Sequence, residues 1–461
     1  MLEKIDLTDD IHFILSMLKE NGQGYIVGGY IRDKLLGLEP IDCDFVTDIS
    51  YDKLHSIFRN YCPKEIGKSF GVMQILFNGK SYEIAKMRQD IGMPENRKEQ
   101  NIKFTTDIYE DLKRRDFTIN AIAYDGDKYF CHDISKIDLS NKVLRFIGNE
   151  NDRIKEDPLR ILRAFRFLGS KNLKIGFSLK NIKANLNLLD KISIERIREE
   201  FNNFVLEKNL IVFRLMSRLG IISKIIPEWE YTIGFDQQSK GHNLTVDEHI
   251  IKAMECVQED LITRLALFFH DIGKPQSFSI DSNGKSHFYN HEIVSRDLAY
   301  KIMNRMKYDK KTIHRVCNLV YTHFFYRSQV NMYFVKKLLN ILGEEDIFRF
   351  YKIVEADKIA HKAPYDFTSI DKMKIFHYKI IKENIPYKKK DLSINGNDLK
   401  NIFNIQGKCI GEILDMLYDF ILNYPEQNKK EILLKEAHNI LEHSHHKSFL
   451  KQNTNSDKRT N

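Results

Sequence analysis

Residues 24–47, GYIVGGYIRDKLLGLEPIDCDFVT, contain the stretch of the chain that decides its fold. The apolar run YIV, the pair Gly28–Gly29 and the run YIRDKLLG predict a strand, a tight turn and a helix. IDCDFVT alternates polar residues with aromatic and β-branched ones, as does SYEIAKM at 81–87, and both are predicted to be strands. The first part of the chain, up to about residue 150, therefore combines short strands with helices.

Asp42 and Asp44 stand two positions apart in the predicted strand IDCDFVT. Side chains at this spacing point to one face of a strand, about 6 to 7 Å apart at the backbone. Such a pair suits Mg²⁺, which prefers one or two carboxylates together with substrate oxygens. Two such ions can stabilise both the attacking and the leaving oxygen of a phosphoryl transfer. Alone, however, a DxD pattern is more often a strand edge or a turn.

The neighbouring glycines strengthen the metal interpretation. Gly28 and Gly29 precede a predicted helix that contains Arg32 and Asp33. Glycines at this place let backbone N–H groups approach a phosphate at the start of a helix. A simple strand-to-helix turn explains the glycines equally well, but GG-x-x-R-D followed closely by D-x-D is rare by chance.

Two further motifs carry arginines beside carboxylates. RRDFTINA at 114–121 places Arg114 and Arg115 next to Asp116, an arrangement that can hold a ribose hydroxyl and phosphate oxygens. A charged strand start is the alternative. In EDPLRILRAFRF, Pro158 favours a helix start, and Asp157, Arg160 and Arg163 follow at i, i+3 spacing on one face. An Asp–Arg pair there can recognise the edge of a base, and a surface salt bridge is the alternative.

Four motifs follow one another along the chain: the stretch that begins at residue 24, RRDFTINAIAYD, EDPLRILRAFRF and ISIERIREEF. In this order, they resemble the motifs of the class II tRNA nucleotidyltransferases and the related bacterial poly(A) polymerases. The resemblance covers about residues 24–205. It implies an α+β chain, in which a nucleotidyltransferase-fold head with a mixed β-sheet precedes all-α neck, HD and tail domains. It also implies addition of CCA to the 3′ end of tRNA lacking it, from CTP and ATP, without a nucleic-acid template.

The same resemblance implies roles for individual residues. Asp42 and Asp44 would be the catalytic pair and hold two Mg²⁺ ions, and Glu83 on the next strand is a candidate third carboxylate. Asp157 and Arg160 would act as a protein template for C and then A. A loop at 88–104 would help to switch between them, although Met93 and Glu99 depart from the usual aromatic and proline. The implied nucleotide-binding set is Gly28, Gly29, Arg32, Arg114, Arg115, Asp116, Asn120, Asp157, Arg160 and Arg163.

A polar break at 236–244, DQQSKGHNL, opens a region that is rich in histidine. A single buried histidine is usually a satisfied core residue, but the His–Asp pair in LALFFHDIGKP is harder to dismiss. Imidazole and carboxylate groups are suitable ligands for several divalent metals. The region at about 242–361 resembles the HD phosphohydrolase superfamily, and this implies a divalent metal of unknown identity and hydrolysis of phosphate esters or 2′,3′-cyclic phosphates. The implied ligands are His249, His270, Asp271, His291, His323 and Asp357.

The C-terminal part resembles the tRNA-contacting tail of the same enzymes. In NGNDLKNIFNIQGKCIGEILDMLYDFIL, Lys408 and Gly411 stand at a predicted helix start, where they can meet RNA phosphates. Arg196 in ISIERIREEF is a further RNA-binding candidate. An ordinary loop that leads into a packing helix is the alternative for the tail. The histidines at 443, 445 and 446 fall in a polar segment and are predicted to be solvated.

Length and composition limit the classes of protein. The 461 residues, 42% hydrophobic and 30% charged, predict a globular chain of several domains. We expect a head, a helical neck, an HD domain, a tail and a disordered end at 1–148, 149–235, 236–375, 376–442 and 443–461. The chain contains no long apolar run and no secretory signal at its start, so we expect a cytoplasmic protein without a membrane partner. Nothing implies a stable protein partner.

Charge and cysteine usage agree with this expectation. The net charge of +8 fits a polyanionic partner, although a lysine-rich genome explains it as well. The six cysteines are scattered without a CxxC pair, which argues against a disulfide framework and a cysteine zinc site.

Other functions remain open from the sequence. A bacterial poly(A) polymerase shares the whole head, but such enzymes usually lack an HD domain and carry a long basic extension. Enzymes that add only A or only CC are further rivals, and the length of the 88–104 loop argues against the latter. A phosphohydrolase with a non-catalytic RNA-binding head is the most distant alternative, and the intact DxD, RRD and EDxxR motifs speak against it.

Overall fold

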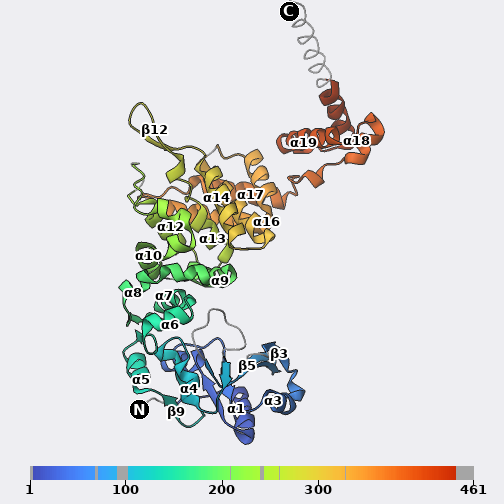
Figure 1. Ribbon diagram of the computed structural model, residues 1–461. Helices are drawn as coiled ribbons and strands as arrows, with labels where there is room; N and C mark the ends of the chain where they lie inside the picture. Colours follow the sequence, from blue (N-terminus) through green and yellow to red (C-terminus); the bar gives the residue numbers. More distant parts are fainter. Residues whose placement is uncertain are drawn as a thin grey trace, which may run out of the picture. The chain divides into compact units, whose positions relative to one another are not determined.

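The computed structural model describes residues 4–67, 71–90, 102–207, 209–238, 243–258, 260–327 and 329–442. The chain divides into two compact units, Met1–Glu230 and Tyr231–Asn461 (Figure 1). Positions 91–101 of the predicted switching loop lie outside the described residues. The same holds for the segment 443–461 with its three histidines.

A mixed seven-stranded sheet forms the centre of the first unit, as predicted. Its strands lie in the order β3-β4-β5-β2-β1-β8-β9. The pairs are antiparallel except β2 with β5, which is parallel. The strand bounds are β1 Gly24–Val27, β2 Asp44–Thr47, β3 Lys64–Gly67, β4 Val72–Phe77, β5 Lys80–Lys86, β8 Ile122–Tyr124 and β9 Tyr129–Cys131.

The predicted strand IDCDFVT is shorter than expected. β2 begins at Asp44, and Asp42 lies in the segment before it, so the prediction that both aspartates belong to one strand is wrong. Burial still alternates, because Cys43 is buried while both flanking aspartates are exposed. In the register of the sheet, Asp44 is paired with Glu83 of β5.

The described part of the first unit contains eleven α-helices, which surround the sheet and continue beyond it. The head core packs Val27, Val46 and Ala123 of the sheet against Ile108 and Leu112 of α4. The helix bounds are α1 Asp9–Asn21, α2 Gly29–Leu35, α3 Tyr51–Ile57, α4 Ile108–Lys113, α5 Asp133–Ser140, α6 Glu150–Glu156, α7 Leu159–Lys171, α8 Leu179–Ala184, α9 Ile194–Leu206, α10 Ile211–Arg218 and α11 Ile221–Ile225.

Short elements complete the first unit. Two small two-stranded pairs, antiparallel β6–β7 and parallel β10–β11, lie outside the main sheet. Their bounds are β6 Arg88–Asp90, β7 Ile102–Phe104, β10 Val143–Leu144 and β11 Lys174–Ile175. The 3₁₀ turns are η1 Arg59–Tyr61, η4 Thr118–Asn120, η5 Leu186–Lys191 and η6 Pro227–Thr232, the last of which runs into the second unit.

The described part of the second unit is helical, apart from one antiparallel hairpin that the sequence did not predict. α16 is kinked at Gly343, which has a backbone φ of 73°. The bounds are α12 Val246–Glu255, α13 Leu261–Phe269, β12 Phe278–Ile280, β13 Ser286–Phe288, α14 His291–Arg305, α15 Lys310–Thr322, α16 Met332–Ala360, α17 Thr368–Lys382, α18 Gly396–Phe403 and α19 Lys408–Asn423, with a last helix at 430–442.

The C-terminal helices have a small core of their own around Leu399, Leu417 and Leu433. The 3₁₀ turns of this unit are η7 Pro275–Ser277, η8 His323–Arg327, η9 Lys389–Asp391 and η10 Pro425–Gln427. Throughout the described part of the chain, helices lack the combination of length and apolar character that crossing a bilayer requires.

Candidate active and metal sites

A pocket of about 740 Å³ in the first unit gathers most of the residues predicted to bind nucleotide. It is an open pocket with both acidic and basic side chains along its walls. Both predicted metal-binding aspartates lie in it, although one precedes the strand. The predicted residues among its lining are Gly28, Gly29, Arg32, Asp42, Asp44, Arg115, Asp116, Asn120 and Arg163.

The acidic wall of this pocket is formed by Asp42 and Asp44. Desolvation and the nearby Glu83 raise the pKa of Asp44, Arg115 lowers it, and Asp42 raises it, so that the net direction is upward. Glu83 faces Asp44 across the parallel pair β2–β5. A divalent cation bound at Asp42 and Asp44 would relieve this repulsion.

The glycine turn brings backbone close to the same wall. Gly28 has φ of 70°, a conformation that L side chains rarely adopt, and α2 begins at the next residue. A Cβ atom at Gly28 would lie 3.2 Å from Nη1 of Arg115. The turn therefore keeps the backbone and the Arg115 guanidinium side by side in the pocket.

A continuous network of polar groups, partly or fully buried, fixes another part of the pocket lining. Nη1 of Arg32 donates to Oδ1 of Asn120 at 2.7 Å, and Nδ2 of Asn120 donates to Oδ1 of Asp116 at 2.8 Å. Arg163 then donates to Oδ2 of Asp116 at 2.7 Å. At the other end, Nε of Arg32 binds Asp33 at 2.8 Å. Burial raises the pKa of Asp116, but Arg163 and Asn120 outweigh it, so the pKa is lowered.

Several residues of this wall were not predicted from the sequence. Phe167 of α7 lies beneath three guanidinium groups, at 4.8 Å from Arg32, 5.5 Å from Arg163 and 4.6 Å from Arg166. Lys171 binds Asp33 at 3.1 Å, and both line the pocket. The spacing of positions 163, 167 and 171 on α7 is the available signal, because residues three and four apart share one helix face.

Three predicted nucleotide-binding residues do not line the pocket. Arg114 binds the buried Asp111 at 2.6 Å. Arg160, which is 6% exposed, donates to Glu156 at 2.8 Å and to the carbonyl oxygens of Arg153 and Arg114. The remaining residue is Asp157, which ion-pairs at 3.0 Å with a neck side chain, Arg196.

The EDxxR motif therefore forms salt bridges in the structure. A salt bridge was the alternative to base recognition that the sequence left open. These bridges are partly buried: Asp157 and Arg160 are each only 6% exposed, while the side chains of their partners Arg196 and Glu156 are 35% and 30% exposed. The predicted RNA contact at Arg196 is likewise occupied by its ion pair with Asp157.

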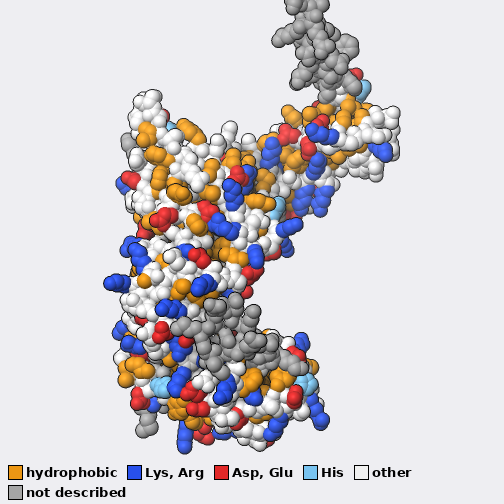
Figure 2. All heavy atoms as spheres, in the orientation of Figure 1, with side chains coloured by type: hydrophobic (Ala, Val, Ile, Leu, Met, Phe, Trp, Pro, Cys, Tyr) orange, Lys and Arg blue, Asp and Glu red, His pale blue; other side chains and the backbone are white. Residues whose placement is uncertain are grey.

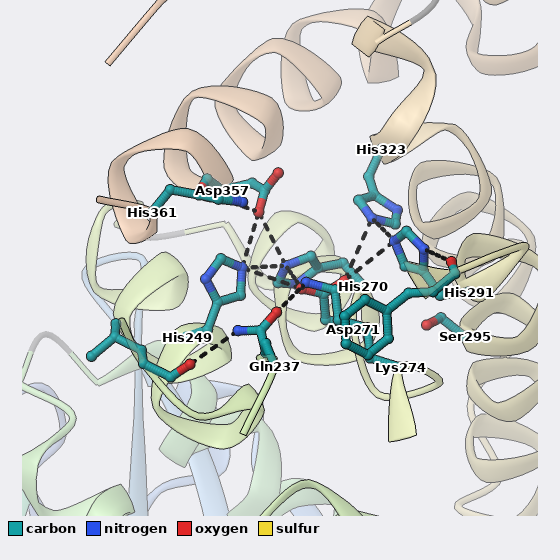
Figure 3. A network of polar contacts seen from close by, with 12 residues as sticks. Gln237, His249, His270, Asp271, Lys274, His291, Ser295, His323, Asp357 and His361 are labelled. Atoms are coloured by element: carbon teal, nitrogen blue, oxygen red, sulfur yellow. Dashed lines mark hydrogen bonds and ion pairs between the residues drawn. The ribbon is translucent and has the colours of Figure 1, made fainter. Parts of the chain in front are cut away.

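The second unit brings all six predicted HD ligands together (Figure 3). His249 lies on α12, His270 and Asp271 follow α13, His291 begins α14, His323 follows α15 and Asp357 lies near the end of α16. They form two groups of closely spaced ligand atoms, and Asp271 belongs to both groups. Each of the six side chains is nearly or fully buried.

Asp271 presents one carboxylate oxygen to each pair of histidines. Its Oδ2 lies 3.2 Å from Nε2 of His249 and 3.3 Å from Nε2 of His270. Its Oδ1 lies 3.5 Å from Nε2 of His291 and 3.8 Å from Nε2 of His323. A carboxylate in this position can bridge two cations. Asp357 adds a fourth ligand to the first group, 3.0 Å from His249.

Backbone carbonyl groups set the tautomer of three rings. Nδ1 of His270, His291 and His323 lies 2.6, 2.9 and 2.5 Å from the carbonyl oxygens of residues 267, 288 and 320. A carbonyl oxygen only accepts, so each Nδ1 carries the hydrogen and each neutral ring turns its Nε2 lone pair inward. Nε2 of His291 and Nε2 of His323 are 3.3 Å apart, and this facing of two lone pairs fits a shared cation.

The pKa values agree with a ligand cluster. Burial and the neighbouring His270 lower the pKa of His323 to about 3, and burial lowers the pKa of His291. Both rings are therefore neutral near pH 7, the form that binds a metal. Burial also lowers the pKa of His270, but Asp271 and Asp357 outweigh it and raise the pKa to about 10. Without a metal this ring therefore carries a proton at neutral pH, and a bound cation would have to displace it.

Close packing supports the HDIG turn. A Cβ atom at Gly273 would lie 2.6 Å from the backbone nitrogen of Ser295 and 2.9 Å from its Oγ, so only glycine fits there. The backbone N–H of Gly273 donates to Oγ of Ser295 at 3.0 Å. α14 is thus held directly against the turn that carries His270 and Asp271.

The other predicted residues are in neither set of site residues. Lys408 is exposed at the start of α19 and lies 3.4 Å from Glu412, and Gly411 has open space around it. Figure 2 shows basic side chains mixed with acidic ones over the visible face of both units. The net positive charge therefore does not by itself mark an RNA-binding face.

Three family models match the chain. Residues 24–145 match the Poly A polymerase head domain, and residues 178–232 match a probable RNA and SrmB-binding site of polymerase A. Residues 290–437 match a putative tRNA nucleotidyltransferase domain 2.

Among relatives, the CCA-adding enzyme of Streptococcus pyogenes is 35% identical over 234 residues, 50% of this chain and 56% of that enzyme. The CCA-adding enzyme of Ligilactobacillus salivarius is 38% identical over 200 residues, 42% of this chain and 49% of that enzyme. The chain thus spans about half the length of the curated relatives it matches.

Solved structures extend the likeness of fold. The Bacillus stearothermophilus CCA-adding enzyme in complex with CTP has a TM-score of 0.70 at 19% identity, covering 95% of this chain and 100% of that one. The Thermotoga maritima CCA-adding enzyme complexed with tRNA has a TM-score of 0.56 at 22% identity, covering 95% and 97%. The resemblance seen in the sequence is confirmed: this chain has a Poly A polymerase-type head domain and the fold of the CCA-adding enzymes.

Proposed function

We propose that the chain is a tRNA nucleotidyltransferase that adds CCA to the 3′ end of tRNA from CTP and ATP, without a nucleic-acid template. The observation that carries this proposal is the pocket of the first unit, whose lining combines Asp42 and Asp44 with Arg32, Arg163 and Lys171. The relatives named CCA-adding enzymes, and the similar structures determined with CTP and with tRNA, support the same substrates.

The pocket residues divide the work of nucleotidyl transfer. Asp42 and Asp44 would hold two Mg²⁺ ions, which when bound lower the pKa of the tRNA 3′ hydroxyl and neutralise pyrophosphate. The basic side chains that line the pocket would hold the triphosphate, because guanidinium groups bind phosphate oxygens in a fixed geometry. Asp116 and Asn120, held by Arg163 and Arg32, would orient the ribose.

The proposed template consists of Asp157 and Arg160, which do not line the pocket themselves. Asp157 and Arg160 are fixed by Arg196 and Glu156. For either to meet a base, its present partner must be exchanged for the base edge. We propose that this exchange couples the choice of nucleotide to a neck domain at 149–235. In the same proposal, the head domain is at 1–148, the HD domain at 236–375 and a tRNA-binding tail at 376–442.

The test is incubation of tRNA lacking its CCA end with each nucleotide and Mg²⁺, followed by sequencing of the added bases. We expect CC with CTP alone and CCA with both nucleotides. Addition of A tails to any RNA, with CTP ignored, would instead identify a poly(A) polymerase. Addition that stops at CC, or begins only after CC, would identify a partial enzyme.

We propose a second activity, metal-dependent hydrolysis of phosphate esters at the HD cluster. The supporting observation is the set of six buried ligands, in which Asp271 turns one oxygen to each histidine pair. Bound divalent ions would supply an activated water and neutralise the phosphate. Hydrolysis of p-nitrophenyl phosphate and of 2′,3′-cyclic AMP in Mg²⁺, Mn²⁺, Ni²⁺ or Co²⁺ tests it. No hydrolysis in a chain that has bound any of these ions would refute it.

A further inference from the structure

Gln237 lies outside every motif of the HD cluster, yet its side chain is connected to the cluster. It stands in the polar break before α12 and is fully buried. Its Oε1 accepts from Nζ of Lys274 at 2.7 Å, and the same Nζ binds Oδ2 of Asp271 at 2.7 Å (Figure 3). A buried path of polar contacts thus runs from Gln237 to the carboxylate shared by the two ligand groups.

The orientation of this amide is fixed on its far side. Nε2 of Gln237 donates to the carbonyl oxygen of Leu244 at 3.1 Å, so the oxygen must face Lys274. The backbone is held as well, because Oγ of Ser286 donates to the carbonyl oxygen of Gln237 at 3.1 Å. A residue held by two side-chain hydrogen bonds and one backbone hydrogen bond offers a rigid acceptor, which favours a positioning role.

The contacts of Lys274 leave part of its ammonium group available. An ammonium has three N–H donors. Gln237 accepts a hydrogen bond from one of them, and Asp271 lies 2.7 Å from Nζ as an ion-pair partner. Within the described ranges, this ammonium donates no other hydrogen bond. The ring of Phe288, 5.6 Å from Nζ, covers a further side. The ammonium group thus lies next to the shared carboxylate with donor capacity left for an anionic oxygen of a phosphate ester.

The chemistry of the partner is also informative. Gln237 is neutral, so it holds Lys274 without cancelling the charge that would attract a phosphate. A carboxylate at the same place would accept the same hydrogen bond but would compete with the phosphate for the ammonium. Gln237 therefore suits a lysine that has to stay in place and stay attractive to an anion.

We infer that Gln237 is a positioning residue that holds Lys274 as the phosphate-binding cation of the second site. This inference rests on the proposed phosphohydrolase function. It predicts that Gln237 controls affinity for phosphate, while the ligand set alone controls binding of the metal. Hydrogen bonds to a charged group are strong enough for an effect of about tenfold or more on phosphate binding.

The experiment compares the full-length protein with Gln237→Glu, Gln237→Met and Lys274→Met. The matched control is Gln238→Glu, which adds the same charge one residue along at an exposed position. Calorimetry with inorganic phosphate gives a Kd in the presence of Mn²⁺, metal analysis gives the cation content, and phosphatase assays give KM and kcat separately. Nucleotide addition at the first unit reports whether each variant is folded.

We expect both changes at Gln237 to raise the phosphate Kd and the KM about tenfold, with unchanged metal content and nucleotide addition. Lys274→Met should lose phosphate binding, and Gln238→Glu should match the wild type. An unchanged phosphate Kd in the Gln237 variants, or a loss of bound metal in them, would overturn the inference. If the wild type binds phosphate without hydrolysing any ester, the proposed activity fails, and the phosphate Kd alone decides the role of Gln237.

Discussion

The pocket of the first unit and the histidine cluster of the second both contain carboxylates suited to a divalent cation, but their candidate ligand sets differ in completeness. Asp42 and Asp44 are exposed and lie in an open pocket, with Glu83 beside Asp44. The cluster around Asp271 is buried and offers ligands from five segments of the chain. The first site needs substrate oxygens to complete the coordination of a cation, whereas the second can hold one by itself.

This difference suggests how each site would be used. A cation that arrives with a nucleotide is well placed to join the triphosphate during synthesis of a phosphodiester bond. A resident cation with inward-facing imidazole rings is suited to activate water for hydrolysis. Substitutions that should affect one site and spare the other test these two roles.

The largest effect is expected from the head carboxylates. Asp42→Ala with Asp44→Ala should lower the rate of nucleotide addition by about a thousandfold or more, because metal ions contribute several kcal/mol of charge stabilisation. The rate is measured by incorporation of labelled CMP into tRNA lacking its CCA end. Residual addition within about tenfold of the wild type would show that other residues hold the cations.

A change at Gly273 should damage the second site without touching a ligand. Gly273→Ala places a Cβ atom 2.6 Å from the nitrogen of Ser295, so α14 or the HD turn must move. We expect a loss of about 1 to 3 kcal/mol in the free energy of unfolding and a lower metal content. Gly411→Ala is the control, because that helical position has open space, and it should not destabilise the protein.

An intermediate effect is expected at the proposed template. Arg160→Ala should change the ratio of C to A addition by about tenfold, within the range measured for bidentate recognition of a base. It should slow the chemical step less than it blurs the choice. Because Arg160 also binds Glu156 and two carbonyl groups, Arg160→Lys serves as a milder variant. Unchanged selectivity in both folded variants would refute the template role.

A pH-dependent effect is expected at the Asp116–Arg163 pair. The pKa of Asp116 is lowered in the folded chain, so its charge stabilises the fold above the ordinary Asp pKa of about 3.9. This stabilisation is lost as the pH falls through the lowered pKa. Asp116→Asn should therefore be less stable than the wild type by about 1 to 3 kcal/mol at neutral pH, and the gap should close in acid. A gap that stays constant into strong acid would contradict this account.

Many candidate residues of both sites could be predicted because they lie in short sequence motifs. The run from Gly24 to Thr47 contains β1, the turn, α2 and β2, and glycine pairs and alternating strands leave clear local patterns. The six predicted HD ligands came from the resemblance of the region at 242–361 to a known family pattern, and the structure brings them together. Asp42 was placed inside a strand that begins two residues later, and strand ends depend on tertiary pairing as well as on local sequence.

What the sequence could not reveal is the set of contacts made across the fold. Phe167 and Lys171 line the pocket because α7 turns that face toward it. Arg160 has predicted helical spacing but binds Glu156, a partner that the spacing alone does not choose. Gln237 lay in a polar break that indicated a connecting segment. Its burial accompanies hydrogen bonds to Lys274 and to the backbone of Leu244.

The most direct test of two independent centres is to measure both activities in one preparation of each of two variants. One carries Asp42→Ala with Asp44→Ala, and the other carries His270→Ala with Asp271→Ala. We expect the first variant to lose nucleotide addition and keep metal-dependent phosphatase activity. The second variant should keep nucleotide addition and lose phosphatase activity. Loss of both activities in either folded variant would contradict the separation of the two sites.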